Sequence, residues 1–148
     1  MVKPGEPLTL KVSTREFRIA DFGGALAVWG MVEGVEVAEG DSKQEIREYL
    51  LRNPGLSRVA VSGDSIVGAV LCGHDGRRGL IYHLAVAPAF QGKGIGQQLL
   101  QECVTGLRSA GLTRAIILVS GENPAGHSFW LRSGWEDITG AIPMARDL

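Results

Sequence analysis

The residues best suited to chemistry form a glycine-rich run just before an amphipathic segment. Gly92, Gly94 and Gly96 alternate with other residues, and Lys93 lies among them. The first backbone N–H groups of a helix lack partners within it, and the helix dipole makes that end positive. Glycines let an anion approach the backbone, and a lysine adds a cation. The run from Gln91 to Gly96 is therefore predicted to bind a phosphate group.

Two common phosphate loops do not fit this run. The dinucleotide fingerprint Gly-x-Gly-x-x-Gly requires a third glycine where this chain has Gln97. The Walker loop requires Ser or Thr after Gly-Lys, but Gly94 follows Gly92-Lys93. Taken alone, the run also fits a tight turn that binds nothing.

A longer stretch around the run resembles a known motif. The segment from Leu84 to Leu100 is similar to the acetyl-CoA motif of the GNAT superfamily of N-acetyltransferases, Gln/Arg-x-x-Gly-x-Gly/Ala, with Gln91, Gly94 and Gly96 at its fixed positions. A second block follows the superfamily pattern of Val-x-x-x-Asn, an apolar-Tyr pair and Gly-Phe, at Val119, Asn123, Phe129, Gly134 and Trp135. The resemblance covers essentially the whole chain and extends to small bacterial members of unassigned substrate.

The resemblance implies acetyl-CoA as co-substrate, with no metal. In such enzymes backbone amides of the loop hold the pyrophosphate, and the pantetheine arm pairs with the preceding strand like an extra strand. The implied coenzyme contacts are Leu84, Ala85, Val86, Gln91, Gly92, Lys93, Gly94, Ile95, Gly96, Gln97, Asn123, Ser128, Trp130 and Arg132.

The implied reaction is direct attack of an amine on the thioester in a ternary complex. The family usually has a tyrosine as general acid seven residues after Asn123, where this chain has Trp130. An indole N–H donates hydrogen bonds but is not a practical acid. Three interpretations stay open: water or another residue protonates the thiolate, the enzyme is slow, or the chain is a non-catalytic acyl-CoA-binding or sensing domain.

Tyr82 and Glu122 are the candidate catalytic residues for proton transfer, Glu122 acting through water. Tyr82 shares a strand face with Leu84 if no bulge intervenes, and His83 then points the other way. A histidine in a strand is more often a packed or surface residue than a base.

The resemblance also implies that the first two helices and their loop bind the acceptor. Trp29 and Glu33 are the predicted acceptor contacts. Glu33, Glu36 and Glu39 make the loop acidic, which favours a cationic amine.

The periodicity of apolar residues indicates which elements position these groups. Asp21 is a plausible helix N-cap, Ser42 and Glu45 form a capping box, and Gly111 suits a helix C-terminus. The apolar segment 113–119 suits a sheet centre covered on both faces. Strands are expected at 8–19, 58–62, 66–72, 80–86, 113–119 and 135–144, and helices at 22–32, 42–53, 94–110 and 124–133. The predicted fold is α/β (α+β), one mixed, mostly antiparallel sheet of about six to seven strands with helices on both faces, GNAT-like.

Length and composition predict one domain over residues 1–148. The net charge of −1 argues against nucleic-acid and anionic-membrane partners. No apolar run reaches the length of a membrane span or resembles a signal peptide. Cys72 and Cys103 lie far apart in the sequence and are expected to be buried, reduced thiols. We therefore expect a cytoplasmic monomer or homodimer whose partners are acetyl-CoA and an amine acceptor.

Overall fold

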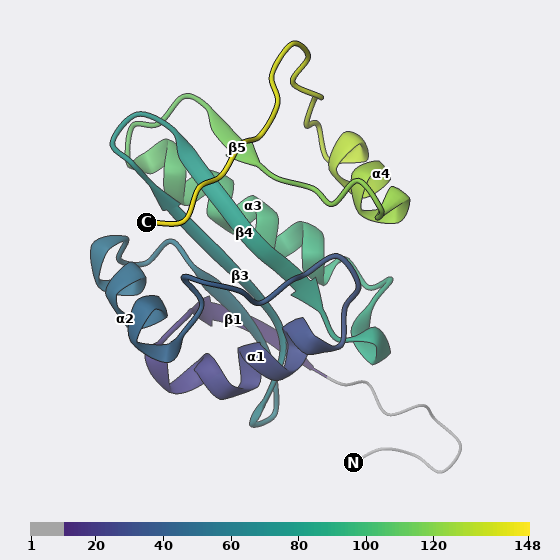
Figure 1. Ribbon diagram of the computed structural model, residues 1–148. Helices are drawn as coiled ribbons and strands as arrows, with labels where there is room; N and C mark the ends of the chain where they lie inside the picture. Colours follow the sequence, from purple (N-terminus) through teal and green to yellow (C-terminus); the bar gives the residue numbers. More distant parts are fainter. Residues whose placement is uncertain (1–10) are drawn as a thin grey trace. The chain divides into compact units, whose positions relative to one another are not determined.

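The computed structural model describes residues 11–148, which form two compact units that divide between Leu118 and Val119. Figure 1 shows the elements along the chain. They are β1 (Val12–Glu16), a 3₁₀ turn (Ile19–Asp21), α1 (Phe22–Gly30), α2 (Lys43–Arg52), β2 (Arg58–Ser62), β3 (Ser65–His74), β4 (Gly79–Val86), a second 3₁₀ turn (Pro88–Phe90), α3 (Ile95–Ser109), β5 (Ala115–Ile117) and α4 (Pro124–Arg132). The first part of the strand predicted over 8–19 lies outside the described residues.

The first unit contains one mixed sheet in the order β1-β2-β3-β4-β5. The pairs from β1 to β4 are antiparallel, and β5 pairs parallel with β4. The predicted mixed, mostly antiparallel α+β fold is confirmed. The predicted number of strands is wrong, because residues 11–148 form five strands rather than six to seven.

One strand prediction accounts for this difference, and another is right only for part of its length. The segment 113–119 forms only the short strand Ala115–Ile117, at an edge of the sheet instead of its centre, and the neighbouring Leu118 is 70% exposed. The segment 135–144 forms no strand. Gly140 has a φ of 79°, which interrupts an extended backbone, and Pro143 has no N–H to donate to a ladder.

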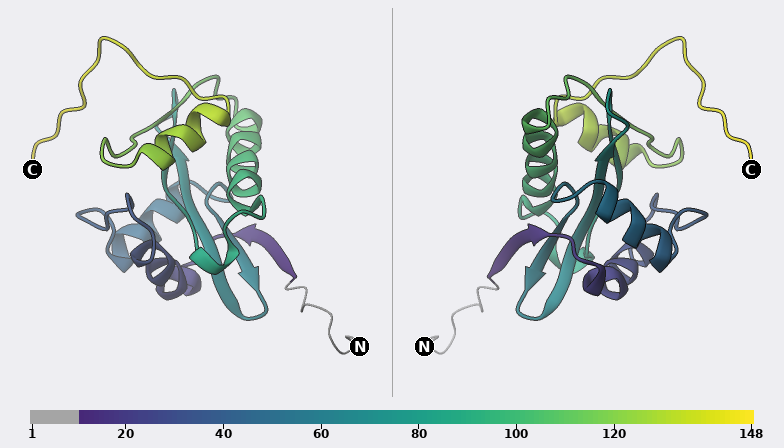
Figure 2. Two further views of the ribbon diagram at one scale, coloured as in Figure 1. Left: turned by 90° about the vertical axis from the view of Figure 1, so that its right-hand side faces the viewer. Right: turned by 90° about the vertical axis from the view of Figure 1, so that its left-hand side faces the viewer.

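Helices cover both faces of this sheet, as predicted. Helix α1 packs on β3 and β4, and α3 packs on β2, β3 and β4. Figure 2 shows α1 and α2 on one side of the strands and α3 on the other. Residues Val67–Gly73 of β3 are all buried, since this strand is covered on both faces. No helix within residues 11–148 has the length and apolar character needed to cross a bilayer.

The predicted helix ends are mostly confirmed. Ser42 accepts a hydrogen bond from the Glu45 N–H at 3.1 Å, and the Glu45 carboxylate accepts one from the Ser42 N–H at 3.3 Å, which completes the capping box. Gly111 has a φ of 91°, and the Leu112 N–H donates to the Leu107 carbonyl at 3.0 Å, closing the end of α3.

Asp21 is the N-cap residue of α1, as predicted, but its carboxylate makes no cap hydrogen bond to that helix. It instead accepts two bonds from the Arg15 guanidinium, at 2.7 and 2.8 Å, and one from the Arg18 N–H at 2.9 Å. The bonds from Arg15 hold the pKa of Asp21 below its usual value. The Asp21 carboxylate therefore pairs with Arg15 of β1 instead of capping the helix.

The two cysteines are free and buried, as predicted. The pKa of the Cys103 thiol is raised, mainly by a hydrogen bond with Cys72 and further by burial. Both cysteines are therefore unreactive core residues.

The contact between α1 and β3 leads to a first testable prediction. A Cβ on Gly24 would lie 2.6 Å from Ile66 Cγ1 and 2.9 Å from Ile66 Cβ, whereas a Cβ on Gly23 would meet nothing within 4 Å. We expect Gly24→Ala to lower the free energy of unfolding by about 1–3 kcal/mol through overpacking. Gly23→Ala, the matched control, should raise it by about 0.5–1 kcal/mol. Denaturant titration measures both, and equal effects would contradict the packing argument.

Candidate functional site

The glycine run forms a loop that leads directly into α3. Gly92 and Gly94 have φ values of 78° and 81°, in the left-handed region that the sequence suggested. Gly94 is the N-cap of α3, and its carbonyl accepts the Gln98 N–H at 3.0 Å. A Cβ at either glycine would meet nothing within 4 Å, so the space above the loop is open. The loop therefore presents open backbone to an approaching anion at the positive end of a 15-residue helix.

Two side chains of this loop, Gln91 and Lys93, make contacts that hold it in place. The motif alone does not predict these contacts. The Gln91 side-chain amide donates to the Val86 carbonyl at 2.9 Å and ties the loop to the end of β4. Lys93 Nζ lies 5.4 Å from the centroid of the Phe90 ring, in a cation–π contact. The loop is thus anchored to the strand that precedes it.

Strand β4 is paired along only part of its β5 side. The parallel ladder joins Gly79 with Ala115 and ends at Ile81 with Ile117. On the other side, pairing with β3 continues to Val86. The β5-facing edge of residues 82–86 therefore lies beyond the ladder, immediately before the glycine loop. An extended ligand could pair with this edge as an added strand.

A β-bulge interrupts β4 at this point. Leu71 pairs with Tyr82 and Ala69 with Ala85, so Val70 lies opposite both His83 and Leu84. His83 has a φ of 54° and is the one non-glycine residue in 11–148 with a positive φ. Such a conformation costs on the order of 1–3 kcal/mol and persists only where its surroundings enforce it.

Three contacts hold the bulge. The Trp29 indole N–H donates to the His83 carbonyl at 2.7 Å, and the two rings lie 5.1 Å apart at 60°. His83 Nε2 lies 2.8 Å from Asp41 Oδ2. The same Asp41 oxygen accepts the Ala38 N–H at 3.0 Å, which fixes it within the loop between α1 and α2. Asp41 was not predicted, because nothing in the sequence links it to a strand 42 residues away.

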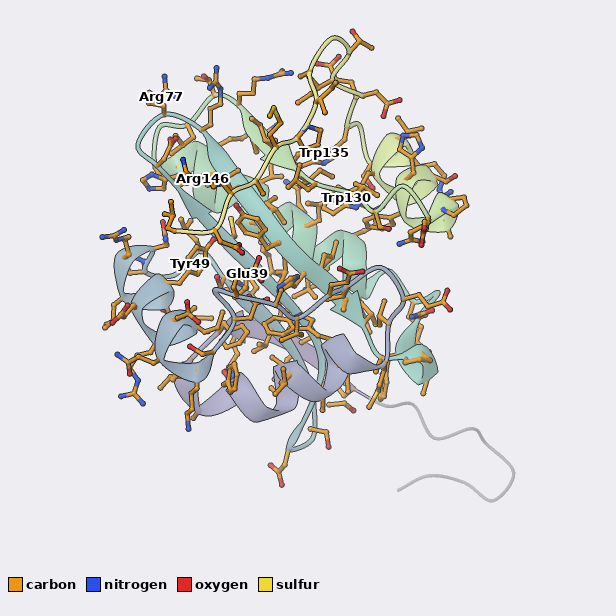
Figure 3. The ribbon with its side chains drawn as sticks, viewed as in Figure 1. Glu39, Tyr49, Arg77, Trp130, Trp135 and Arg146 are labelled. Atoms are coloured by element: carbon orange, nitrogen blue, oxygen red, sulfur yellow. The ribbon has the colours of Figure 1, made fainter. Side chains whose placement is uncertain are left out.

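The second unit contains the other predicted block. Asn123 caps α4, since its side-chain oxygen accepts the Gly126 N–H at 3.0 Å. Trp130 is half-buried and meets Phe129 and Trp135 edge-on, with ring centroids 5.5 and 5.0 Å away. Figure 3 shows Trp130 and Trp135 next to each other. Ser128, Arg132 and Glu122 are exposed.

Comparison with known proteins identifies the family. The model of the acetyltransferase (GNAT) family matches residues 25–135. This chain belongs to the GNAT family. An acetyltransferase of Sodalis glossinidius is 30% identical over 122 residues, which are 82% of this chain and 85% of that relative. One from Pectobacterium atrosepticum is 32% identical over 111 residues, 75% of this chain and 78% of the relative.

Solved structures share the GNAT fold. PaiA N-acetyltransferase from Thermoplasma acidophilum, in complex with coenzyme A, matches with a TM-score of 0.73 and 20% identity over 88% of this chain and 94% of that one. An acetyltransferase from Streptococcus agalactiae matches with a TM-score of 0.75 and 15% identity over 93% of this chain and 91% of that one. At these identities the likeness shows the fold alone.

The structure corrects one predicted acceptor contact of this GNAT chain. Trp29 is 0% exposed and packs in the core beside Phe17, with ring centroids 6.2 Å apart, so it cannot touch an acceptor directly. No local signal in the sequence showed that this aromatic residue of α1 would lie in the core, with its indole N–H bonded to the His83 carbonyl. Glu33, Glu36 and Glu39 are exposed on the loop that follows, where Figure 3 shows Glu39.

Tyr82 lies at the same bulge of this GNAT sheet. It is 37% exposed, and burial of the remainder raises the pKa of its phenol, which is therefore protonated at neutral pH. Because of the bulge, Tyr82 shares a face with Ala85, so the alternation expected between Tyr82 and Leu84 does not apply. In residues 11–148 no group of three or more His, Cys, Asp and Glu side chains could hold a metal ion.

Proposed function

We propose that this GNAT protein transfers an acetyl group from acetyl-CoA to an amine of a small molecule or protein, by direct attack in a ternary complex. One observation supports this most directly: the unpaired edge of β4 leads into the glycine loop, which Gln91 ties to β4, and the loop leads into the start of α3. The family match spans both units, which supports the further proposal that residues 1–148 form one domain.

The first unit supplies one set of proposed coenzyme contacts. The backbone from Gln91 to Gln97 would bind the pyrophosphate, with Lys93 adding positive charge. The backbone of Leu84, Ala85 and Val86 would pair with the pantetheine arm, and an N–H near Val86 would polarise the thioester carbonyl.

The second unit supplies the remaining proposed contacts. The Asn123 oxygen is engaged in the cap of α4, so we assign its side-chain N–H₂ to the coenzyme. Trp130 would pack on the pantetheine arm, and the exposed Ser128 and Arg132 would reach polar groups of the coenzyme.

The proposed chemistry forms a C–N bond and breaks the thioester C–S bond. The amine must lose protons, and the departing thiolate must gain one. We assign Tyr82, a protonated phenol, to the thiolate, and Glu122 to the amine through a water molecule. Thiols have an ordinary pKa of about 8.5, so the thiolate leaves readily even without the tyrosine that Trp130 replaces.

We further propose that the acceptor is a cationic amine that meets the loop after α1. Glu33 is our assigned contact there, because it is exposed and carries the charge opposite to that of an ammonium group. Glu36 and Glu39 extend the same negative surface.

Thermal unfolding with added ligands tests the coenzyme assignment. Acetyl-CoA and CoA should each stabilise the protein, by about 2.7 kcal/mol at 100 times the dissociation constant. Nicotinamide adenine dinucleotide should not, since the loop lacks the third glycine of that fingerprint. Thiol release from acetyl-CoA in the presence of amines tests turnover. Absence of a shift with acetyl-CoA would contradict the proposal.

A further inference from the structure

His83 and Asp41 form an ion-pair geometry at the one strained position of the sheet. His83 Nε2 and Asp41 Oδ2 are 2.8 Å apart, and their side chains are 16% and 12% exposed. The two residues come from different elements, the bulge of β4 and the loop between α1 and α2. Figure 1 shows that this loop runs beside β4. Strain, partial burial and a fixed charged partner are features that structural histidines seldom combine.

The hydrogen bonds determine which nitrogen of His83 is available. Asp41 is a carboxylate and can only accept, so Nε2 carries the proton in the neutral ring. Nδ1 then holds a lone pair, and within residues 11–148 it makes no hydrogen bond. Within residues 11–148 Tyr49 Oη is the one buried side-chain nitrogen or oxygen without a hydrogen bond, so the unbonded Nδ1 of His83 is accessible to solvent.

Two further contacts prevent the ring from turning away. The Trp29 indole holds the His83 carbonyl at 2.7 Å, and the Trp29 ring packs on the imidazole at 5.1 Å. Asp41 is itself fixed by the Ala38 N–H at 3.0 Å. The imidazole is thus oriented by a carboxylate whose own position is set, an arrangement used to align catalytic bases.

The position on β4 gives this pair its role. His83 lies in the segment 82–86, beyond the end of the β4–β5 ladder, where the proposed function places the thioester arm. Asp41 lies on the loop that the proposed function assigns to the acceptor. The pair therefore lies where a coenzyme on the strand and an amine on the loop would meet.

We propose that His83 is the general base that deprotonates the acceptor amine, with Asp41 as the positioning residue that stabilises the resulting imidazolium. This inference rests on the proposed acetyl transfer, and it assigns to His83 the proton that would otherwise pass through water to Glu122. The ammonium gives one proton to Nδ1, which passes it to water. The freed lone pair forms the C–N bond, and the C–S pair leaves with the thiolate. Tyr82 protonates that thiolate and regains a proton from the nitrogen of the adduct.

Chemical rescue separates this role from a structural one. Glycine tolerates a positive φ, so His83→Gly keeps the bulge without strain while it removes the base. Thiol release from acetyl-CoA is measured with spermidine, lysine amide and an alanyl peptide as acceptors. We expect His83→Gly to lower turnover by about 100-fold or more, and added imidazole to restore it by about tenfold. The acetyl-CoA thermal shift should persist.

Two more variants complete the experiment. Asp41→Asn should lower turnover by about tenfold or more without changing the thermal shift. His74→Gly, the same change at the histidine that ends β3, should leave turnover near that of the wild type. A loss in His83→Gly that imidazole does not rescue, or turnover within about threefold of the wild type, overturns the assignment. Absence of turnover by the wild type with all three acceptors overturns the proposed function, and the base with it.

Discussion

Gly94→Ala should weaken binding of acetyl-CoA by about 10- to 100-fold. The Gly94 φ of 81° is unfavourable for a residue with a Cβ, and that Cβ would project into the open space above the loop. A phosphate held away from the backbone would lose hydrogen bonds to a charged group, each contributing about 1.5–3 kcal/mol. Isothermal titration with acetyl-CoA measures the loss.

The chain offers a matched control for this backbone change. Gly76, in the β3–β4 turn, has a φ of 92°, and a Cβ there would also meet nothing within 4 Å. Gly94→Ala and Gly76→Ala should therefore each lower the free energy of unfolding by about 1–2 kcal/mol. Gly76→Ala should leave acetyl-CoA binding unchanged. Equal binding by the Gly94 and Gly76 variants would show that the loop does not bind the coenzyme.

Replacing Trp29 should cost the most stability of any change considered. Trp29→Ala removes a fully buried indole from the core and should lower the free energy of unfolding by about 3–5 kcal/mol. Trp29→Phe keeps most of the volume but leaves the His83 carbonyl without its donor, at a cost of about 1–3 kcal/mol. Because this bond fixes the bulge, we expect Trp29→Phe also to lower turnover.

A second core change separates stability from orientation at the bulge. Val28 precedes Trp29 in α1 and is 2% exposed. Val28→Ala should lower the free energy of unfolding about as much as Trp29→Phe, because it leaves a cavity, but it does not change the hydrogen bond to the His83 carbonyl. Denaturant unfolding and thiol release, both measured at a temperature where the variants are folded, compare the two. If Val28→Ala and Trp29→Phe reduced turnover equally, the indole bond would have no specific role.

Features that depend on neighbours in the sequence were predictable. The Ser42–Glu45 box, the Gly111 terminus and the glycine loop each form within a few residues, so their residue types are sufficient. The periodicity of apolar residues indicated the order of the elements around them. The place of β5 in the sheet was not predictable in the same way, because an apolar segment such as 113–119 suits an edge as well as a centre.

Features that depend on distant partners were missed. Asp21 is the N-cap residue of α1, but the sequence did not show that its carboxylate would pair with Arg15 of β1 instead of the helix. Nor did it show that the Trp29 indole would donate to the His83 carbonyl inside the core. Nothing in the sequence predicted that Asp41 would contact His83, because His83 lies in a bulge that exists only when β3 and β4 pair. The part of the site that sequence could not supply is thus the part assembled by tertiary contacts.

The bulge gives β4 one residue more than its pairing with β3 needs, because Val70 lies opposite two residues. Deletion of His83 would leave the flanking pairs, Leu71 with Tyr82 and Ala69 with Ala85, in their present registers and on their present faces. Such a shortened chain would keep its strand pairing. It would lose the carbonyl that accepts the Trp29 indole N–H and the imidazole that meets Asp41, which are the contacts that the extra residue adds to the sheet.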